Sequence, residues 1–300
     1  MSNYRARFNA NVYFTNGGSL STEGFRLDVP NKLVDSSDVA RLLVQHLGLA
    51  LVGRIELTEL EIFEEAHKGS RGIPVTSEVK IARLVDLSHE IEAGLITYPG
   101  LPAPIITPHL TREKSQSIYA PGTEFAMDII TMIGNTGTYL DSPYHRYANG
   151  IDLAALDLAT LANLRAEVFH LDDSIERGIP AEVFYDRDLA SAAVLLHTGW
   201  DRFFGSKEYG ANAPFLTEAA ARYLVDVGVH LVGIDSVNID DTQSGGTRPA
   251  HSLLLAAGIH VVEHLTNLAE LPSQGSRFTA VPPKIKSFGT FPVRAFAEIN

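Results

Sequence analysis

The segment from Asn135 to His145 concentrates residue types that carry out acid–base and metal chemistry. It reads Asn-Thr-Gly-Thr-Tyr-Leu-Asp-Ser-Pro-Tyr-His. On a strand, residues two apart point the same way, so Asn135, Tyr139 and Asp141 are expected to share one face. Pro143 cannot continue a strand ladder, which places His145 on the following loop. Such a polar face is costly to bury unless it lines a functional cleft; the alternative is a surface strand with incidental polar residues.

This segment resembles the signature of the cyclase family, which includes bacterial kynurenine formamidase and isatin hydrolase. The signature runs His-x-Gly-Thr-His-x-Asp-x-Pro-x-His. Five of its positions match here: Gly137, Thr138, Asp141, Pro143 and His145. Asn135 and Tyr139 stand where the family has its first two histidines.

Further stretches resemble the family in the same order along the chain. They are Asp86–Ser88, Tyr98–Gly100, His197–Trp200 and Gly233–Ser236. His251 and Glu263 also have the spacing of the family's distal pair of metal ligands. The resemblance extends from about Val79 to the C-terminus and leaves the first part of the chain unmatched.

The resemblance implies roles for single residues. The family's motif histidines and aspartate hold a divalent metal, the distal His and Glu complete a second site with the same aspartate, and the last motif histidine transfers protons. Carried over, Asp141, His251 and Glu263 are the expected metal ligands and His145 the expected base. Asn135, Tyr139 and Asp141 join His145 as the expected catalytic residues.

The loss of two histidines leaves two hypotheses open. In the first, Asp141, His251 and Glu263 still hold one divalent cation, Zn or Mn, with open positions for water. In the second, the site is metal-free, and Tyr139 and Asn135 polarise a carbonyl as hydrogen-bond donors while His145 transfers the proton.

These hypotheses lead to three candidate functions. The first is hydrolysis of an amide, lactam or lactone bond in a small aromatic or cyclic substrate. The second is a metal-independent lyase or cyclase reaction that uses Tyr139 and His145, and the third is a non-catalytic, ligand-binding member of the family. Tyr98 and Trp200 are the expected substrate contacts, with a core position as the alternative for Trp200. His264 is expected to face away from Glu263.

The expected architecture has two parts. Residues 1–75 predict a small antiparallel α+β domain of order β-β-α-β-β, with a helix capped by Ser36 or Ser37, strands at Leu49–Leu57 and Glu59–Glu65, and a linker at His67–Gly72. Residues 79–300 predict an α/β domain that resembles the family's swivelling β/β/α fold. Its expected elements include strands at Ala193–Leu196, His230–Ile234 and Ile259–Val262, and a helix over Leu216–Val227.

Composition narrows the function further. The net charge of −12 disfavours nucleic acid and anionic membranes as partners, leaving a small-molecule substrate. The sequence has 0 cysteines, which excludes disulfides, zinc–thiolate sites and a cysteine nucleophile. The chain shows neither a signal-peptide pattern nor a long apolar run, so a cytoplasmic location is expected. By resemblance, the protein is expected to be a homo-dimer or tetramer.

Overall fold

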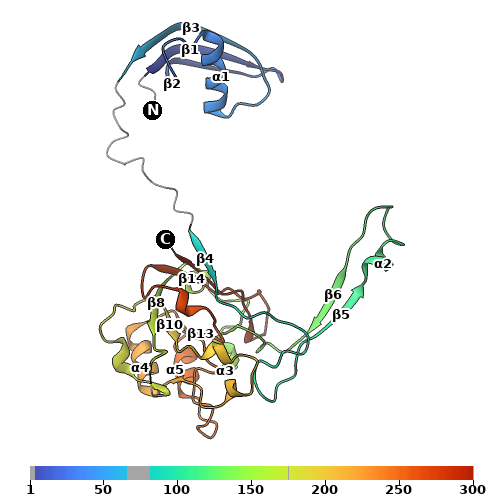
Figure 1. Cartoon of the computed structure of the whole chain (residues 1–300), viewed down its shortest axis with the longest axis vertical. Coiled ribbons are helices and arrows are strands. Elements are labelled where there is room, and N and C mark those ends of the chain that lie inside the picture. The colour runs from blue at the N-terminus through green and yellow to red at the C-terminus, as the bar shows by residue number, and fades with distance from the viewer. Residues whose placement is uncertain (1–3, 66–81, 175, 300) are drawn as a thin grey trace. The chain divides into compact units, whose positions relative to one another are not determined.

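The computed structural model describes residues 4–65, 82–174 and 176–299. The chain divides into two compact units, Met1–Val79 and Lys80–Asn300 (Figure 1). The expected linker at His67–Gly72 and the expected boundary between residues 75 and 79 lie outside the described residues. In the part of the chain that is described, no helix is long and apolar enough to cross a membrane.

The N-terminal unit is a three-stranded antiparallel sheet with one helix. Its strand order is β2-β1-β3. Every second residue of β1 from Ala6 to Val12 is buried, and this apolar face packs against Val39 and Leu43 of the helix. The elements are β1 (Tyr4–Phe14), β2 (Ser19–Val29), α1 (Ser36–Leu47) and β3 (Val52–Glu64).

Two local expectations for this unit are wrong. The two strands expected after the helix are the single strand β3, in which Glu59 has a φ of 55° where the register with β1 shifts. Such a bulge reverses the alternation of side chains, and in the sequence it looks like the end of a strand. The cap of α1 is Asp35, whose carboxylate accepts from the amides of Ser37 and Asp38.

The C-terminal unit is an α/β structure, as expected, and it is built on a nine-stranded mixed sheet. Its strand order is β15-β7-β13-β12-β10-β8-β14-β16-β4. The four central strands are parallel: β8 (Leu164–His170), β10 (Ala193–His197), β12 (Leu231–Ile234) and β13 (His260–Glu263). Antiparallel strands flank them: β7 (Tyr139–Asp141) and β15 (Thr290–Pro292) on one side, and β14 (Ser276–Thr279), β16 (Phe296–Ile299) and β4 (Arg83–Asp86) on the other.

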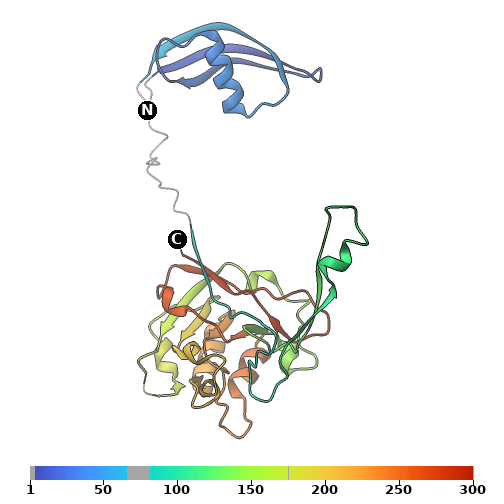
Figure 2. The same cartoon turned by 45° about the vertical axis from the view of Figure 1, so that its right-hand side comes forward.

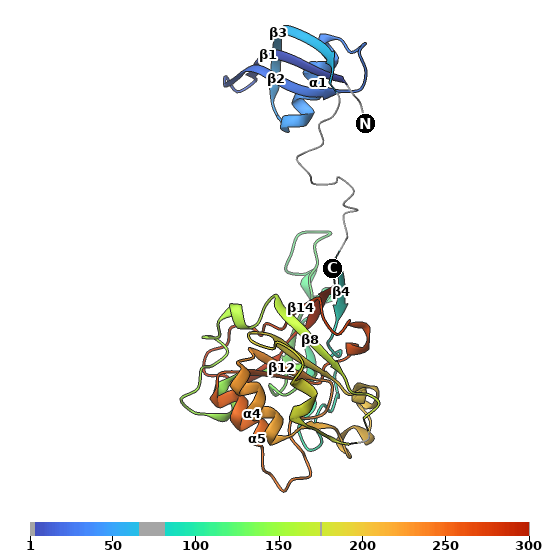
Figure 3. The ribbon, with the colours of Figure 1, turned by 90° about the vertical axis from the view of Figure 1, so that its left-hand side faces the viewer.

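The central strands bury both of their faces, which explains their continuous apolar runs. Along β10, Leu195 belongs to one core cluster and Leu196 to another. The second cluster includes α4 (Glu218–Val227) and α5 (Pro249–Ala256), which lie side by side against the sheet (Figure 3). Helix α4 begins after its cap Thr217 and ends at the left-handed Gly228, as the sequence predicts.

A two-stranded arm extends away from the sheet (Figure 2). Strands β5 (Ile105–Leu110) and β6 (Met127–Thr131) form it, and the short helix α2 (Arg112–Ser115) lies between them. The remaining elements are short: α3 (Pro143–Arg146), β9 (Gly178–Ile179), β11 (Phe215–Leu216) and the 3-10 turns η1 (Leu158–Thr160), η2 (Ala181–Phe184), η3 (Trp200–Phe203), η4 (Glu208–Gly210) and η5 (Leu268–Glu270).

His260 on β13 makes the stability of this unit depend on pH. Burial, together with the charge of His230, lowers the pKa of His260 to about 4. The unfolded chain therefore binds a proton at this residue below pH ~6.5 that the folded chain does not, and stability is lost as the pH falls. Through His260 alone, the free energy of unfolding falls by about 2 kcal/mol when the pH is lowered from ~7.5 to ~5.

We predict that the gap in unfolding free energy between the wild type and His260→Gln narrows by about 2 kcal/mol when the pH falls from ~7.5 to ~5. Urea unfolding followed by the fluorescence of Trp200, the 1 tryptophan of the chain, measures this unit alone. The exposed His109 provides the control variant His109→Gln, which should show no pH-dependent gap. An equal gap for His260→Gln at both pH values would contradict the prediction.

Candidate active site

Strand β7 places the motif residues against β13. Its register pairs Tyr139 with Glu263 and Asp141 with Val261. The strand is shorter than the sequence predicts, because the chain turns at Gly137. Gly137 has a φ of 64°, and a Cβ there would lie 2.8 Å from the side chain of Ile91. The motif glycine is thus a steric requirement for the turn that leads into β7.

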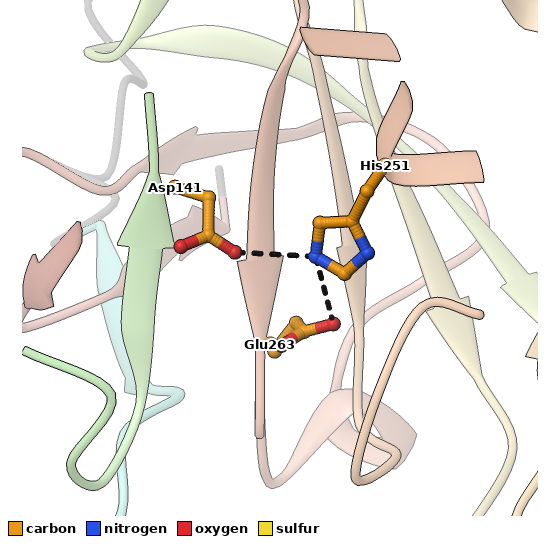
Figure 4. A group of neighbouring side chains, drawn as sticks. All are labelled: Asp141, His251 and Glu263. Atoms are coloured by element: carbon orange, nitrogen blue, oxygen red, sulfur yellow. Dashed lines mark ion pairs between the residues drawn. The ribbon is translucent and has the colours of Figure 1, made fainter. Parts of the chain in front are cut away.

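Asp141, His251 and Glu263 form a buried cluster (Figure 4). The Nε2 atom of His251 lies 3.4 Å from Oδ2 of Asp141 and 3.5 Å from Oε1 of Glu263. One ligand atom from each of the three residues lies within 4.8 Å of the other two. The structure therefore brings together the three residues that the sequence singles out as metal ligands, from β7, α5 and β13.

Asp240 determines which ring nitrogen of His251 faces this cluster. Its carboxylate accepts from Nδ1 of His251 at 2.7 Å and from the amides of Ala250 and His251 at 2.6 and 3.0 Å. Because Nδ1 donates its hydrogen to Asp240, Nε2 points at Asp141 and Glu263. A carboxylate behind a histidine is the usual support of a metal ligand. Nothing in the sequence pattern indicated Asp240.

Glu263 is held from two sides. The amide of Ile239 donates to Oε1 at 2.6 Å, and the hydroxyl of Tyr139 donates to Oε2 at 2.6 Å. Burial raises the pKa of Tyr139 well above its usual value, and the negative charges of Glu263 and Asp141 add to the effect. Tyr139 therefore keeps its hydrogen and orients Glu263. Asn135 lies beside the Tyr139 hydroxyl, in the loop before β7.

His264 belongs to the same network, and the expectation that it faces away is wrong. Strand β13 ends at Glu263, and His264 has a φ of 57°, so the alternation of the strand does not extend to it. Its Nε2 atom lies 3.3 Å from the hydroxyl of Tyr139, and its Nδ1 atom lies 2.7 Å from that of Tyr209. Burial lowers the pKa of His264 to about 3, so the ring is neutral.

The charges of the cluster are unbalanced. Asp141, Asp240 and Glu263 are buried around the single imidazole of His251. Burial favours the neutral imidazole, yet the charge of Glu263 and the hydrogen bonds with Asp141 and Asp240 prevail and raise the pKa of His251 to about 10. Burial raises the pKa of Glu263 to about 7. Three carboxylates around one imidazole leave excess negative charge, which a divalent cation would neutralise.

His145 lies beside the cluster, on α3 rather than on a loop. Thr290 of β15 connects it to Asp141: the Thr290 hydroxyl donates to Oδ1 of Asp141 and lies 2.7 Å from Nδ1 of His145. Because the single hydroxyl hydrogen goes to the carboxylate, Nδ1 of His145 must be the donor in the second bond. Nε2 of His145 then carries the free lone pair that a general base needs.

A cavity of about 870 Å³ opens beside these residues. Its wall includes Asn135, Tyr139, His145, His251 and Glu263. Tyr98, Leu101 and Ile133 add an apolar part to the wall. Such a volume accommodates a small organic molecule. The structure thus gathers three of the four expected catalytic residues, two of the three expected metal ligands and Tyr98 around one space, while Asp141 is not part of the wall.

Trp200 lies elsewhere, and the core alternative describes it better. It packs against Phe203 and against the buried cluster that includes Tyr209, and its indole nitrogen donates to the carbonyl of Tyr209 at 2.9 Å. It is absent from the described wall of the cavity. Trp200 is therefore a partly buried packing residue, in a cluster that Tyr98 also contacts.

Comparisons with known proteins agree with this geometry. Residues 85–241 match a family model described as a putative cyclase. An isatin hydrolase of Roseibium aggregatum is 27% identical over 217 residues, which cover 64% of this chain and 82% of that protein. A kynurenine formamidase of Delftia acidovorans is 29% identical over 224 residues, which cover 71% of this chain and 96% of that protein.

Solved structures share the fold. Isatin hydrolase A from Ralstonia solanacearum superimposes with a TM-score of 0.62 at 21% identity, covering 73% of this chain and 92% of that one. A structure described as a potential metal-dependent hydrolase with cyclase activity gives a TM-score of 0.60 at 25% identity, covering 73% and 98%. The fold expected from the motif is thereby confirmed.

We predict that the purified protein binds one equivalent of Mn²⁺ or Zn²⁺ and that Asp141→Asn abolishes this binding, because the variant loses a carboxylate ligand. Asp240→Asn, which removes only the support behind His251, should weaken binding about 10- to 100-fold. Isothermal titration calorimetry measures both effects. The exposed Asp226 of α4 provides the control Asp226→Asn. Equal affinities in the wild type and Asp141→Asn would place the cation elsewhere.

Proposed function

The chain belongs to the cyclase family, and from that premise we propose that it hydrolyses an amide, lactam or lactone bond of a small aromatic or cyclic substrate. The observation that carries this proposal is the Asp141–His251–Glu263 cluster, which adjoins His145 and the cavity. Amide hydrolysis needs a polarised carbonyl, an activated water and a proton carrier. The relatives named above are hydrolases, which supports the same reaction class.

A divalent cation, Zn or Mn, fits the three acidic and imidazole side chains. Oδ2 of Asp141 is buried and has only the 3.4 Å ion pair with Nε2 of His251, which is lost when that nitrogen gives up its hydrogen, so a cation that both atoms bind would complete its surroundings. Asp141, His251 and Glu263 would hold the ion, with Asp240 and Tyr139 orienting two of these ligands. A bound cation polarises a carbonyl and lowers the pKa of water.

His145 is the proposed proton carrier. Its Nε2 lone pair is free because Nδ1 donates to Thr290, and its side chain is 36% exposed at the cavity. It accepts a proton from the attacking water and returns it to the leaving nitrogen or oxygen. Asp141 acts on His145 through Thr290, in the way that a carboxylate orients the histidine of a catalytic triad. Thr290 is therefore a positioning residue.

The apolar wall supports an aromatic or cyclic substrate. Tyr98, Leu101 and Ile133 offer flat and branched apolar surface on the same cavity as His145. A substrate whose planar ring packs against this surface would direct its amide, lactam or lactone bond toward the cluster of Asp141, His251 and Glu263. Desolvating a ring in this way contributes roughly 25 cal/mol for each Å² of apolar surface removed from water.

The metal-independent lyase or cyclase reaction remains a prediction with less support. It requires the Tyr139 hydroxyl to donate to the substrate, but its hydrogen goes to Glu263 at 2.6 Å. A role as a non-catalytic binding protein also remains a prediction. It requires His145 to be dispensable.

We predict that the enzyme loaded with Mn²⁺ or Zn²⁺ hydrolyses N-formyl aryl amides or isatin, and that His145→Gln lowers kcat about 10²- to 10⁴-fold because the proton carrier is lost. Absorbance of the released arylamine or of the opened ring measures the rate. The control is His109→Gln, on the arm. Full activity in His145→Gln would exclude the assigned role, and activity that survives chelation would favour the metal-independent reaction.

Assembly as a homo-dimer or tetramer is the second part of the proposal, and the arm supports it. Two adjacent isoleucines are exposed on each strand of the arm: Ile105 and Ile106 on β5, and Ile129 and Ile130 on β6. Because adjacent residues of a strand point to opposite faces, both faces of the arm carry exposed apolar side chains. An isolated two-stranded hairpin is barely stable in water, and exposed apolar patches mark interaction sites. A second copy of this chain offers the same surface, so a symmetric contact would cover both arms.

We predict that light scattering gives the wild type the mass of a dimer or tetramer, and that Ile106→Lys combined with Ile129→Lys shifts it toward the monomer. Two buried charges at the contact would each be costly to desolvate. Ile151→Lys, at an exposed site away from the arm, is the control. A wild type that stays monomeric at high concentration would contradict this part of the proposal.

A further inference from the structure

Two arginines stand on the wall of the cavity, next to the residues that carry the chemistry. Arg146 directly follows His145 at the end of α3, and Arg248 caps the N-terminal end of α5, which carries His251. Ser252 connects them: its hydroxyl donates to the carbonyl of Arg248 at 2.7 Å and accepts from Nε of Arg146 at 3.3 Å. Ser252 thus joins the side chain of Arg146 to the main chain of Arg248, and both arginines line the same cavity.

Neither guanidinium forms an ion pair with a carboxylate among the residues that the structure describes. Arg248 is half-buried, and its Nη1 atom donates to the main-chain carbonyls of Thr247 at 2.8 Å and Asp241 at 3.4 Å. Carbonyl groups fix the side chain in place but do not neutralise its charge.

The nearest acidic side chains already have other partners. The pKa of Asp241 is lowered, against the effect of burial, by hydrogen bonds from the Gln243 amide and from Arg177, with only the smallest part from the charge of Arg248. Its carboxylate forms its ion pair with Arg177 at 2.8 Å. Glu218, which also lines the cavity, pairs with Arg222 at 2.5 Å. In a chain of net charge −12, two cationic groups without their own carboxylate on a cavity wall are an unusual local feature.

We propose that Arg146 and Arg248 form an anion subsite that binds a carboxylate of the substrate, outside the bond that is cleaved. Guanidinium groups bind carboxylates through paired, charge-assisted hydrogen bonds, which fix orientation as well as add affinity. Together with the apolar wall of Tyr98, Leu101 and Ile133, the subsite selects an aromatic or cyclic amide that bears a carboxylate. This inference rests on the proposed hydrolysis and names the class of substrate for it.

The test compares two substrates that differ in one carboxylate, 2-formamidobenzoate and formanilide. The ratio of their kcat/KM values should favour the carboxylate in the wild type and fall at least tenfold in Arg146→Met and in Arg248→Met, mainly through KM. Arg248→Lys keeps the positive charge but loses the planar guanidinium. Its ratio of kcat/KM values should lie between those of the wild type and of Arg248→Met. Arg277→Met, at an exposed position of β14 that is not part of the cavity wall, should leave the ratio unchanged. An unchanged ratio in both methionine variants would overturn the proposal.

Direct binding separates this inference from the proposed hydrolysis. Calorimetric titration with benzoate needs no turnover, and benzoate affinity should fall at least tenfold in Arg146→Met and Arg248→Met but not in Arg277→Met. If the wild type hydrolyses neither formamide yet binds benzoate in this arginine-dependent way, the anion subsite stands and the proposed reaction fails. Benzoate binding that is absent, or independent of both arginines, would overturn the subsite itself.

Discussion

The gathering of three buried carboxylates around one imidazole is the constraint on which the rest of the site depends. Asp141, Asp240 and Glu263 lie in a region from which water is largely excluded, and His251 is the common neighbour of all three. Carboxylates repel one another at such distances, so each must be fixed by hydrogen bonds from elsewhere. Backbone amides of Ile239, Ala250 and His251 and the hydroxyls of Tyr139 and Thr290 provide them. Even so, negative charge remains in excess, and a divalent cation accounts for it better than any side chain nearby.

The sheet makes this arrangement mechanically stable. Strand β7 pairs with β13 on one side and β15 on the other, so Tyr139, Asp141, Glu263 and Thr290 are held by neighbouring ladders. The central parallel strands are buried on both faces, which leaves little freedom for β13 to move. His251 comes from α5, whose first amides are bound to Asp240, and the same carboxylate positions both the helix and the His251 side chain. Strands and α5 therefore supply the cluster, while much of the cavity wall comes from loops and from the ends of α3 and α5.

Tyr139 shows how the departure from the family signature is accommodated. It stands where the signature has a histidine, but its hydroxyl keeps its hydrogen and donates to Glu263, because burial among negative charges makes ionisation unfavourable. The chain has thus exchanged a residue of metal-ligand type for one that orients a ligand. His264 and Tyr209 extend this contact into a buried chain of hydrogen bonds. The exchange is consistent with one cation held by the remaining three side chains rather than with two.

The sequence alone determined the local framework of this protein: the motif from Gly137 to His145, the pair His251 and Glu263, the apolar runs of the central strands and the capped helix α4. These follow from patterns within a few residues, where periodicity and turn chemistry act directly. Tertiary structure alone decided that Asp240 supports His251, that Thr290 links Asp141 to His145 across 149 positions, and that Trp200 packs in a cluster outside the described cavity wall. The left-handed backbone of His264, which directs its side chain toward Tyr139, also depends on the tertiary structure, as does the placement of Arg146 near Arg248. Contacts of this kind depend on which strands become neighbours and which way a side chain turns at their ends, and neither is encoded in spacing along the chain.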